Sequence, residues 1–77
     1  MPAKKQENLT NQIRRLRFDN GEMSQQELAE RIGVTRQTII ALEAGKYVPS
    51  LTLAFRLAST FGVQVEGVFQ YQDGLSN

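Results

Sequence analysis

The chain has 77 residues, a net charge of +1 and 40% hydrophobic residues. A chain of this length forms one small domain with a thin core, which leaves little room for an enzyme with a deep pocket. Its apolar fraction is too high for a disordered tail. No apolar run approaches the roughly 18 residues of a membrane span, and residues 1–12 lack the apolar stretch of a signal peptide. We therefore expect a soluble, cytoplasmic domain that does not associate with a membrane.

The sequence contains neither cysteine nor histidine. Without cysteine, disulfides and thiolate chemistry are excluded. Without histidine, the commonest metal ligand and general base are missing. The eight carboxylates are scattered and show no calcium-loop spacing. We expect no cofactor, no metal ion, no catalytic residue and no small-molecule ligand.

The charges are unevenly distributed along the chain. Residues 1–17 carry five basic side chains and one acidic one, whereas residues 18–77 carry four basic and seven acidic ones. This imbalance permits an anionic partner. We expect residues 1–9 to form a flexible basic arm, residues 10–72 to form the domain, and residues 73–77 to form a flexible tail.

Two helices are predicted in the first half of the domain. The first begins at Thr10 as N-cap and runs to about Asn20. The second begins at Ser24, and Glu27 three residues later completes a capping box. Gly33 ends the second helix, and only two residues separate it from the next helical run. The sequence therefore predicts a very tight turn at this point.

The next two helices also have clear ends. Residues 36–44 form the third helix, with Thr35 as N-cap. Ser50 caps the fourth helix, which runs to Phe61. A broad apolar face is predicted for the fourth helix from Leu51, Ala54, Phe55, Leu57, Ala58 and Phe61.

The end of the domain combines a short helix over residues 65–68 with a strand over residues 69–72, where polar and aromatic residues alternate. The strand can pair with residues near the N-terminus or with a partner subunit. Phe18 lies outside the buried stripe of the first helix, and packing under this strand is one option for it. The fold class is therefore all-α, a compact domain of four to five short helices with a short C-terminal β-strand.

Residues 24–47 have the order helix, glycine-containing tight turn, helix. This order is typical of a helix-turn-helix unit, whose second helix can lie in a DNA major groove. Ala29 is small where the helices cross, and Gly33 permits a left-handed backbone in the turn. Ile39 and Leu42 point inward and anchor the second helix of the unit.

The outward face of that helix has no acidic side chain and little bulk. It consists of Gln37, Ile40, Ala41 and Ala44, with Arg36 at its N-terminal rim. Arginine reads guanine, glutamine reads adenine, and small apolar groups contact the thymine methyl. An exposed Ile40 is consistent with a base methyl contact, and packing on a neighbouring side chain is the alternative. The face predicts base contacts by Arg36, Gln37, Ile40 and Ala41.

The chain resembles the lambda-repressor-like helix-turn-helix regulators, often called the XRE family. Within that family it is similar to the very small single-domain members of the cytolysin-operon repressor type. The matching text is IRRLR, SQQELAERIGVTRQTI, LEAGKYVPSLTLAFRLASTFGV and VFQYQ, so the resemblance covers residues 13–72 and is highly specific. Glu22 departs from the pattern by adding a residue before Met23, away from the reading face.

The resemblance implies roles for further residues. Gln25, at the start of the second helix, is implied to bond a phosphate, because helix N-termini favour anions. Thr35, Thr38, Lys46 and Tyr47 are likewise assigned to the DNA phosphates, with Thr38 divided between phosphate contact and packing. Such contacts position a protein on DNA without choosing its sequence.

Two implied features concern structure and assembly. Arg17 and Glu43 are implied to form a structural ion pair that ties the first helix to the third. The resemblance also points to a two-fold dimer through the fourth helix and the C-terminal region. We predict that the dimer interface contains Leu53, Leu57, Phe69 and Tyr71.

The leading interpretation is a sequence-specific DNA-binding transcriptional regulator. We expect a repressor that binds a pseudo-palindromic operator in double-stranded DNA as a homodimer. The alternative is an antitoxin-type protein that neutralises a toxin partner and autoregulates its operon, which a neighbouring toxin gene would reveal. An enzyme is disfavoured because no nucleophile–base pair, metal cluster or phosphate loop is present.

Overall fold

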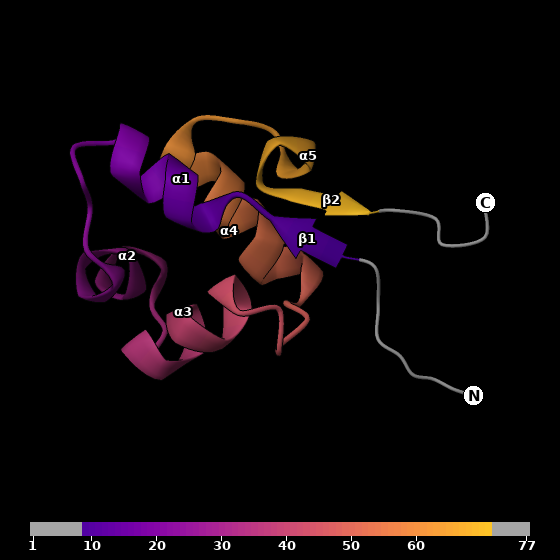
Figure 1. Cartoon of the computed structure of the whole chain (residues 1–77), viewed down its shortest axis with the longest axis horizontal. Coiled ribbons are helices and arrows are strands. Elements are labelled where there is room, and N and C mark those ends of the chain that lie inside the picture. The colour runs from indigo at the N-terminus through magenta and orange to yellow at the C-terminus, as the bar shows by residue number, and fades with distance from the viewer. Residues whose placement is uncertain (1–8, 72–77) are drawn as a thin grey trace.

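The computed structural model describes residues 9–71, which form five helices and one two-stranded sheet (Figure 1). The strands are β1 (Leu9–Asn11) and β2 (Phe69–Tyr71). The helices are α1 (Ile13–Asp19), α2 (Gln25–Ile32), α3 (Arg36–Glu43), α4 (Leu51–Phe61) and α5 (Val65–Val68). The predicted helical fold with a short C-terminal strand is confirmed.

The two strands bring the ends of the described chain together. They pair antiparallel, with Leu9 opposite Tyr71 and Asn11 opposite Phe69. Of the two pairing options for the C-terminal strand, the structure therefore has the one with N-terminal residues. Leu9 is half-buried in β1, so the predicted arm of residues 1–9 extends one residue too far. Residues 1–8 and the predicted tail of residues 73–77 lie outside the described residues.

The first helix begins later than predicted. Thr10 lies in β1 and does not cap a helix, and α1 begins at Ile13. The Gln12 backbone N–H donates to the Val68 carbonyl oxygen at 2.8 Å, which continues the strand pairing by one residue. Residues 9–11 are therefore held extended by a partner that lies far away in the sequence, and Gln12 leads from the strand into α1.

Three predicted helix starts are confirmed by their caps. The hydroxyls of Ser24, Thr35 and Ser50 each accept a backbone N–H from three residues later, at 2.9, 3.2 and 3.1 Å. Such a cap contributes about 1 kcal/mol to stability. The capping box at Ser24 is only half formed, because the Glu27 carboxylate pairs with Arg31 at 3.1 Å.

The buried side chains of residues 9–71 form one cluster, and Figure 1 shows α4 in the middle of the other elements. The buried side chains of α4 are Leu53, Ala54, Leu57, Ala58 and Phe61. Leu51 and Phe55, which we predicted on the buried face, are 72% and 58% exposed. Only one side of α4 packs against the core, and α4 has further apolar side chains that lie outside this side.

The predicted dimer surface is not formed as expected. Leu57 is fully buried, and Leu53 and Phe69 are buried in the same core. A side chain without exposed surface cannot contact a second copy, so the prediction is wrong for Leu57. Leu53 and Phe69 retain only 7% and 9% exposed surface, and their place in an interface stays a prediction. Tyr71 alone is exposed, at 69%. Phe18 is also exposed and does not pack under β2.

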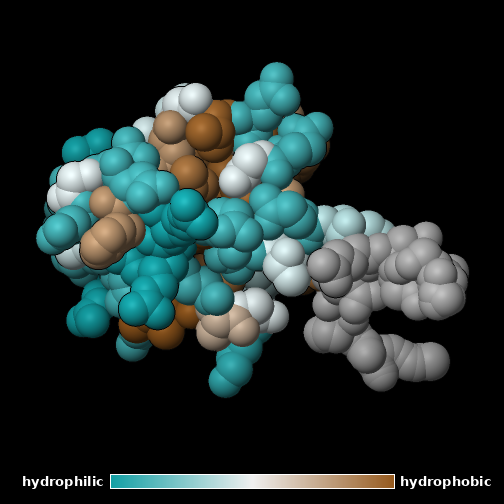
Figure 2. All heavy atoms as spheres, turned by 45° about the horizontal axis from the view of Figure 1, so that its top comes forward, coloured by the Kyte–Doolittle hydropathy of each residue, from teal (hydrophilic) through white to brown (hydrophobic). Residues whose placement is uncertain are grey.

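Figure 2 shows that one face of the molecule is largely hydrophilic, with hydrophobic atoms emerging in separate areas. Large hydrophobic side chains with substantial exposure are Phe18, Ile40, Tyr47, Val48, Leu51, Phe55, Val63 and Tyr71. Ile40 and Tyr47 belong to the predicted DNA face, whereas Leu51, Phe55 and Val63 belong to α4 and the turn after it. No helix within residues 9–71 is long and apolar enough to cross a membrane.

Candidate nucleic-acid interface

A tight turn with two backbone hydrogen bonds joins α2 to α3. Gly33 has φ +77°, a left-handed conformation that glycine adopts without steric cost. The backbone N–H groups of Gly33 and Val34 both donate to the Ala29 carbonyl oxygen, at 2.9 and 3.0 Å. Thr35 follows as N-cap, so α3 begins at once. This geometry is the helix-turn-helix unit that the sequence predicted.

The inward side of α3 fixes which residues face outward. Ile39 and Leu42 are 0% and 1% exposed. On the other side, Arg36, Gln37 and Ile40 are exposed and Ala41 is half-buried. The four residues predicted to contact bases therefore reach the surface of one helix, without an acidic side chain among them.

The residues predicted to contact phosphates surround this helix. Gln25 is the first residue of α2 and is half-buried. The hydroxyl oxygens of Thr35 and Thr38 lie 3.1 Å apart in the first turn of α3. Lys46 and Tyr47 are exposed just beyond its last turn. These side chains thus lie at the start of α2 and at both ends of α3.

Unpaired positive charge lies at both ends of α3. The ion pairs in residues 9–71 join Arg15 to Asp19, Arg17 to Glu43, and Arg31 to Glu27. Within that range, Arg36 and Lys46 have no carboxylate partner. A surface with cations that are free of internal partners attracts a polyanion.

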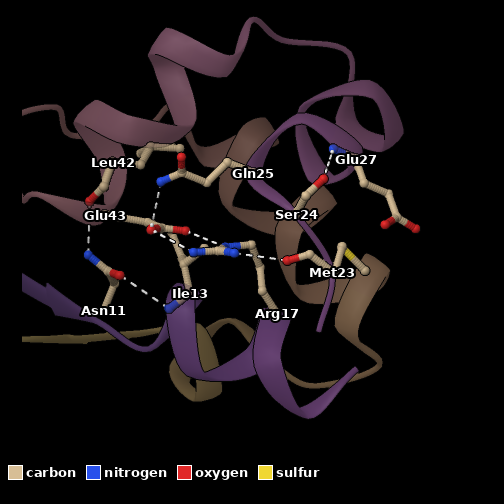
Figure 3. Close-up of polar contacts among 9 residues, drawn as sticks. All are labelled: Asn11, Ile13, Arg17, Met23, Ser24, Gln25, Glu27, Leu42 and Glu43. Carbon is tan, nitrogen blue, oxygen red and sulfur yellow. Dashed lines mark hydrogen bonds and ion pairs between the residues drawn. The ribbon is translucent and has the colours of Figure 1, made fainter. Parts of the chain in front are cut away.

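A part-buried polar network holds the last turn of α3 (Figure 3). Arg17 donates to both Glu43 carboxylate oxygens, from Nε at 2.6 Å and from Nη2 at 3.1 Å. Its Nη1 donates to the Met23 carbonyl oxygen at 2.8 Å. Gln25 Nε2 also donates to Glu43 Oε1, at 3.2 Å. The network thus ties α1, the start of α2 and α3 together.

Asn11, in β1, holds the same turn of α3 through a separate contact, and it is not among the residues predicted from the sequence. Its Nδ2 donates to the Leu42 carbonyl oxygen at 2.9 Å, and its Oδ1 accepts from the Ile13 backbone N–H at 3.2 Å (Figure 3). The bond between Asn11 and Leu42 cannot be predicted from a local sequence pattern, because the two residues are 31 positions apart in the chain.

Metal-ligating side chains do not cluster in the part of the chain that the structure describes. No group of three or more metal-ligating side chains there lies close enough to hold an ion. Within the same residues, no buried side-chain nitrogen or oxygen lacks a hydrogen-bond partner. The polar groups near α3 are thus used for hydrogen bonding within the fold or are exposed.

Comparison with known proteins shows close relatives. A sequence model of the helix-turn-helix family matches residues 13–68. An uncharacterized HTH-type transcriptional regulator of Methanocaldococcus jannaschii is 57% identical over 51 residues, covering 66% of this chain and 77% of that relative. The uncharacterized HTH-type transcriptional regulator YgzD of Bacillus subtilis is 43% identical over 65 residues, covering 84% of this chain and 97% of that relative.

A solved structure shares the fold. The crystal structure of a candidate DNA-binding protein from Bacteroides fragilis matches with a TM-score of 0.69, over 80% of this chain and 98% of that one. The two sequences are 22% identical, so this likeness concerns the fold alone.

Proposed function

Since this chain belongs to the helix-turn-helix family of transcriptional regulators, we propose that it is a repressor that binds a pseudo-palindromic operator as a homodimer. The observation that carries this proposal is the outward side of α3, which is free of acidic side chains and carries Arg36 and Lys46 at its two ends, neither paired with a carboxylate of residues 9–71. An α-helix of this kind fits the major groove of B-DNA. Bound at a promoter, the dimer would block transcription by occupying the site.

Four side chains are proposed to read bases. Arg36 and Gln37 stand in the first turn of α3, and Ile40 and Ala41 follow one turn later. An arginine can donate two hydrogen bonds to guanine, and a glutamine amide matches adenine. Ile40 is 41% exposed, and contact with a thymine methyl group would remove this apolar surface from water.

The phosphate contacts are proposed for Gln25, Thr35, Thr38, Lys46 and Tyr47. Their support is placement, because they lie at the start of α2 and at the two ends of α3. The N-terminus of a helix carries free backbone N–H groups and a partial positive charge, which favour a phosphate next to Gln25. These contacts would set the orientation of α3 in the groove.

A second copy of the chain is proposed to cover the exposed apolar side of α4. One hollow there is lined by the apolar side chains of Leu51, Phe55, Val63 and Val65, with Ser59, Gln64 and Glu66 as polar residues of its lining. An adjoining hollow shares Leu51 and Val65 with it and continues to Phe69. A largely apolar surface that is present on both copies can pair with itself about a two-fold axis. This surface shares Phe69 with the residues first predicted, and Tyr71 stays a candidate because it lies two residues from Phe69 in β2.

Selection of binding sites from random duplex DNA, at two salt concentrations, tests the proposal. We expect a two-fold-symmetric motif whose half-sites lie about one helical turn apart. Weak, steeply salt-dependent binding without an enriched motif would contradict it and would direct attention to a protein partner, such as a toxin.

A further inference from the structure

We infer that Asn11 is a positioning residue for DNA recognition, because it fixes the last turn of α3 from the two-stranded sheet. This inference rests on the proposed function of α3 as the helix that reads DNA. Asn11 lies in β1 and does not belong to the helix-turn-helix unit.

The Asn11 amide uses both of its ends. Nδ2 donates to the Leu42 carbonyl oxygen in α3, and Oδ1 accepts from the Ile13 N–H at the start of α1. Gln12, which stands at the N-cap position of α1, makes no side-chain cap bond. Asn11 therefore caps α1 and holds α3 with one planar group, as Figure 3 shows.

The end of α3 is held more firmly by polar contacts than its start. Leu42 is held by Asn11, and the adjacent Glu43 is held by Arg17 and Gln25. These contacts come from β1, α1 and α2. The side-chain hydrogen bonds described for the first turn of α3 are those between Thr35 and Thr38, which are local. Side-chain hydrogen bonds from other elements of the fold thus fix the position of α3 at its last turn.

The position of this last turn determines how the proposed contact residues of α3 meet the DNA. Ala41 immediately precedes Leu42, and the Lys46 N–H bonds the Ala41 carbonyl oxygen at 2.9 Å. A shift of the last turn would move a proposed base contact and a proposed phosphate contact together. Hydrogen bonds weaken steeply with poor geometry, and a recognition site tolerates misplacement of only about 0.5 Å.

The chemistry requires an amide at residue 11. An asparagine has a donor and an acceptor on one branch, whereas an ionised aspartate is an acceptor only. Asn11→Asp therefore keeps the acceptor for the Ile13 N–H and places a negative charge favourably at the start of α1. It loses the bond to Leu42 and turns a carboxylate oxygen toward that carbonyl.

Asn20 offers a matched control. Its Nδ2 donates to the Leu16 carbonyl oxygen at 2.8 Å at the other end of α1, on the exposed surface. Asn20→Asp thus makes the same charge change and removes the same kind of bond, away from α3. Asn11→Ser adds a neutral variant, because a short hydroxyl can cap Ile13 without also holding Leu42.

The experiment compares dissociation constants for the selected operator and for random duplex DNA at one salt concentration. Protein concentrations are corrected for the active fraction by stoichiometric titration. We expect Asn11→Asp and Asn11→Ser to lower the ratio of specific to non-specific affinity about tenfold, the factor for one lost hydrogen bond. Asn20→Asp should leave the ratio unchanged.

A purely structural role for Asn11 predicts a different result. It would reduce the folded fraction, which affects both kinds of binding equally and leaves the ratio intact. If both Asn11 variants keep the wild-type ratio, the inference is overturned while the proposed function stands. If the wild-type protein itself shows a ratio near one, the proposed function fails first, and the inference fails with it.

Discussion

Arg17 and Glu43 form a two-point ion pair between α1 and α3, with their side chains only 14% and 12% exposed. The remaining bonds of this pair, to Met23 and Gln25, satisfy further donors and acceptors. Charges removed from water are expensive unless they are paired in this way. The pair therefore fixes the angle between the first helix and the proposed reading helix.

Breaking this pair should destabilise the fold strongly. We expect Glu43→Ala to lower the free energy of unfolding by about 3 kcal/mol, because Arg17 is left charged and poorly hydrated. The exposed pair of Arg31 and Glu27 is the control, and Arg31→Ala should cost no more than about 0.5 kcal/mol. Urea unfolding followed by circular dichroism measures both. Equal small losses in the two variants would show that burial of the first pair has no energetic consequence.

Arg36 and Lys46 should affect DNA binding in different ways. We expect Arg36→Ala to relax sequence preference at one base position and to cost about 1–3 kcal/mol. Lys46→Ala should weaken binding to all sequences and lower the slope of log affinity against log salt by about one. Site selection and a salt titration with each variant separate the two effects. An unchanged base preference in the first variant, or an unchanged slope in the second, would remove that residue from its proposed role.

The exposed apolar side of α4 should carry the dimer. Phe55→Lys places a charge in the proposed interface, where it would be desolvated on association. We expect this variant to sediment as a monomer and to lose affinity for the full palindrome while keeping its affinity for a half-site. Phe18→Lys is the matched control, since Phe18 is also exposed, on α1, and lies outside the proposed interface. A dimer that persists in Phe55→Lys, or one that Phe18→Lys dissolves, would assign the interface elsewhere.

The sequence predicts most helix ends because their signals are local. Ser24, Thr35 and Ser50 each bond a backbone N–H three residues away, and Gly33 and Gly62 end their helices in left-handed conformations. The outward side of α3 follows equally well from helical periodicity. What these outward residues contact stays a prediction, because periodicity concerns exposure and not the ligand.

The features that the sequence misses depend on distant partners or on ambiguous periodicity. Thr10 has the character of a helix cap, but its strand pairs with residues about sixty positions away. In α4, the apolar residues Leu51, Leu53 and Phe55 are compatible with more than one buried stripe, and only the packed core selects Leu53. Asn11 is missed for the first reason, since its role depends on a carbonyl group in α3.

Ile40 should read a thymine methyl group. Replacing one thymine in each half-site of the selected operator by deoxyuridine removes the methyl and leaves every base hydrogen bond in place. We expect one such position at which the dissociation constant rises about fourfold per half-site, the factor for one methyl-sized apolar group. In Ile40→Ala, the same replacement should have little effect, because the partner side chain of that methyl group has been removed.

Val48→Ala is the control variant for the experiment that combines Ile40→Ala with the replacement of thymine in the operator. Val48 is 59% exposed and apolar, but it lies after α3 and not on its outward side. It should keep the full sensitivity to deoxyuridine, since it has no part in the proposed methyl contact. Equal sensitivity in the wild-type protein and in Ile40→Ala, at every thymine of the site, would mean that Ile40 does not contact a methyl group. Its exposed surface would then need another explanation, such as contact with the sugar of the DNA backbone.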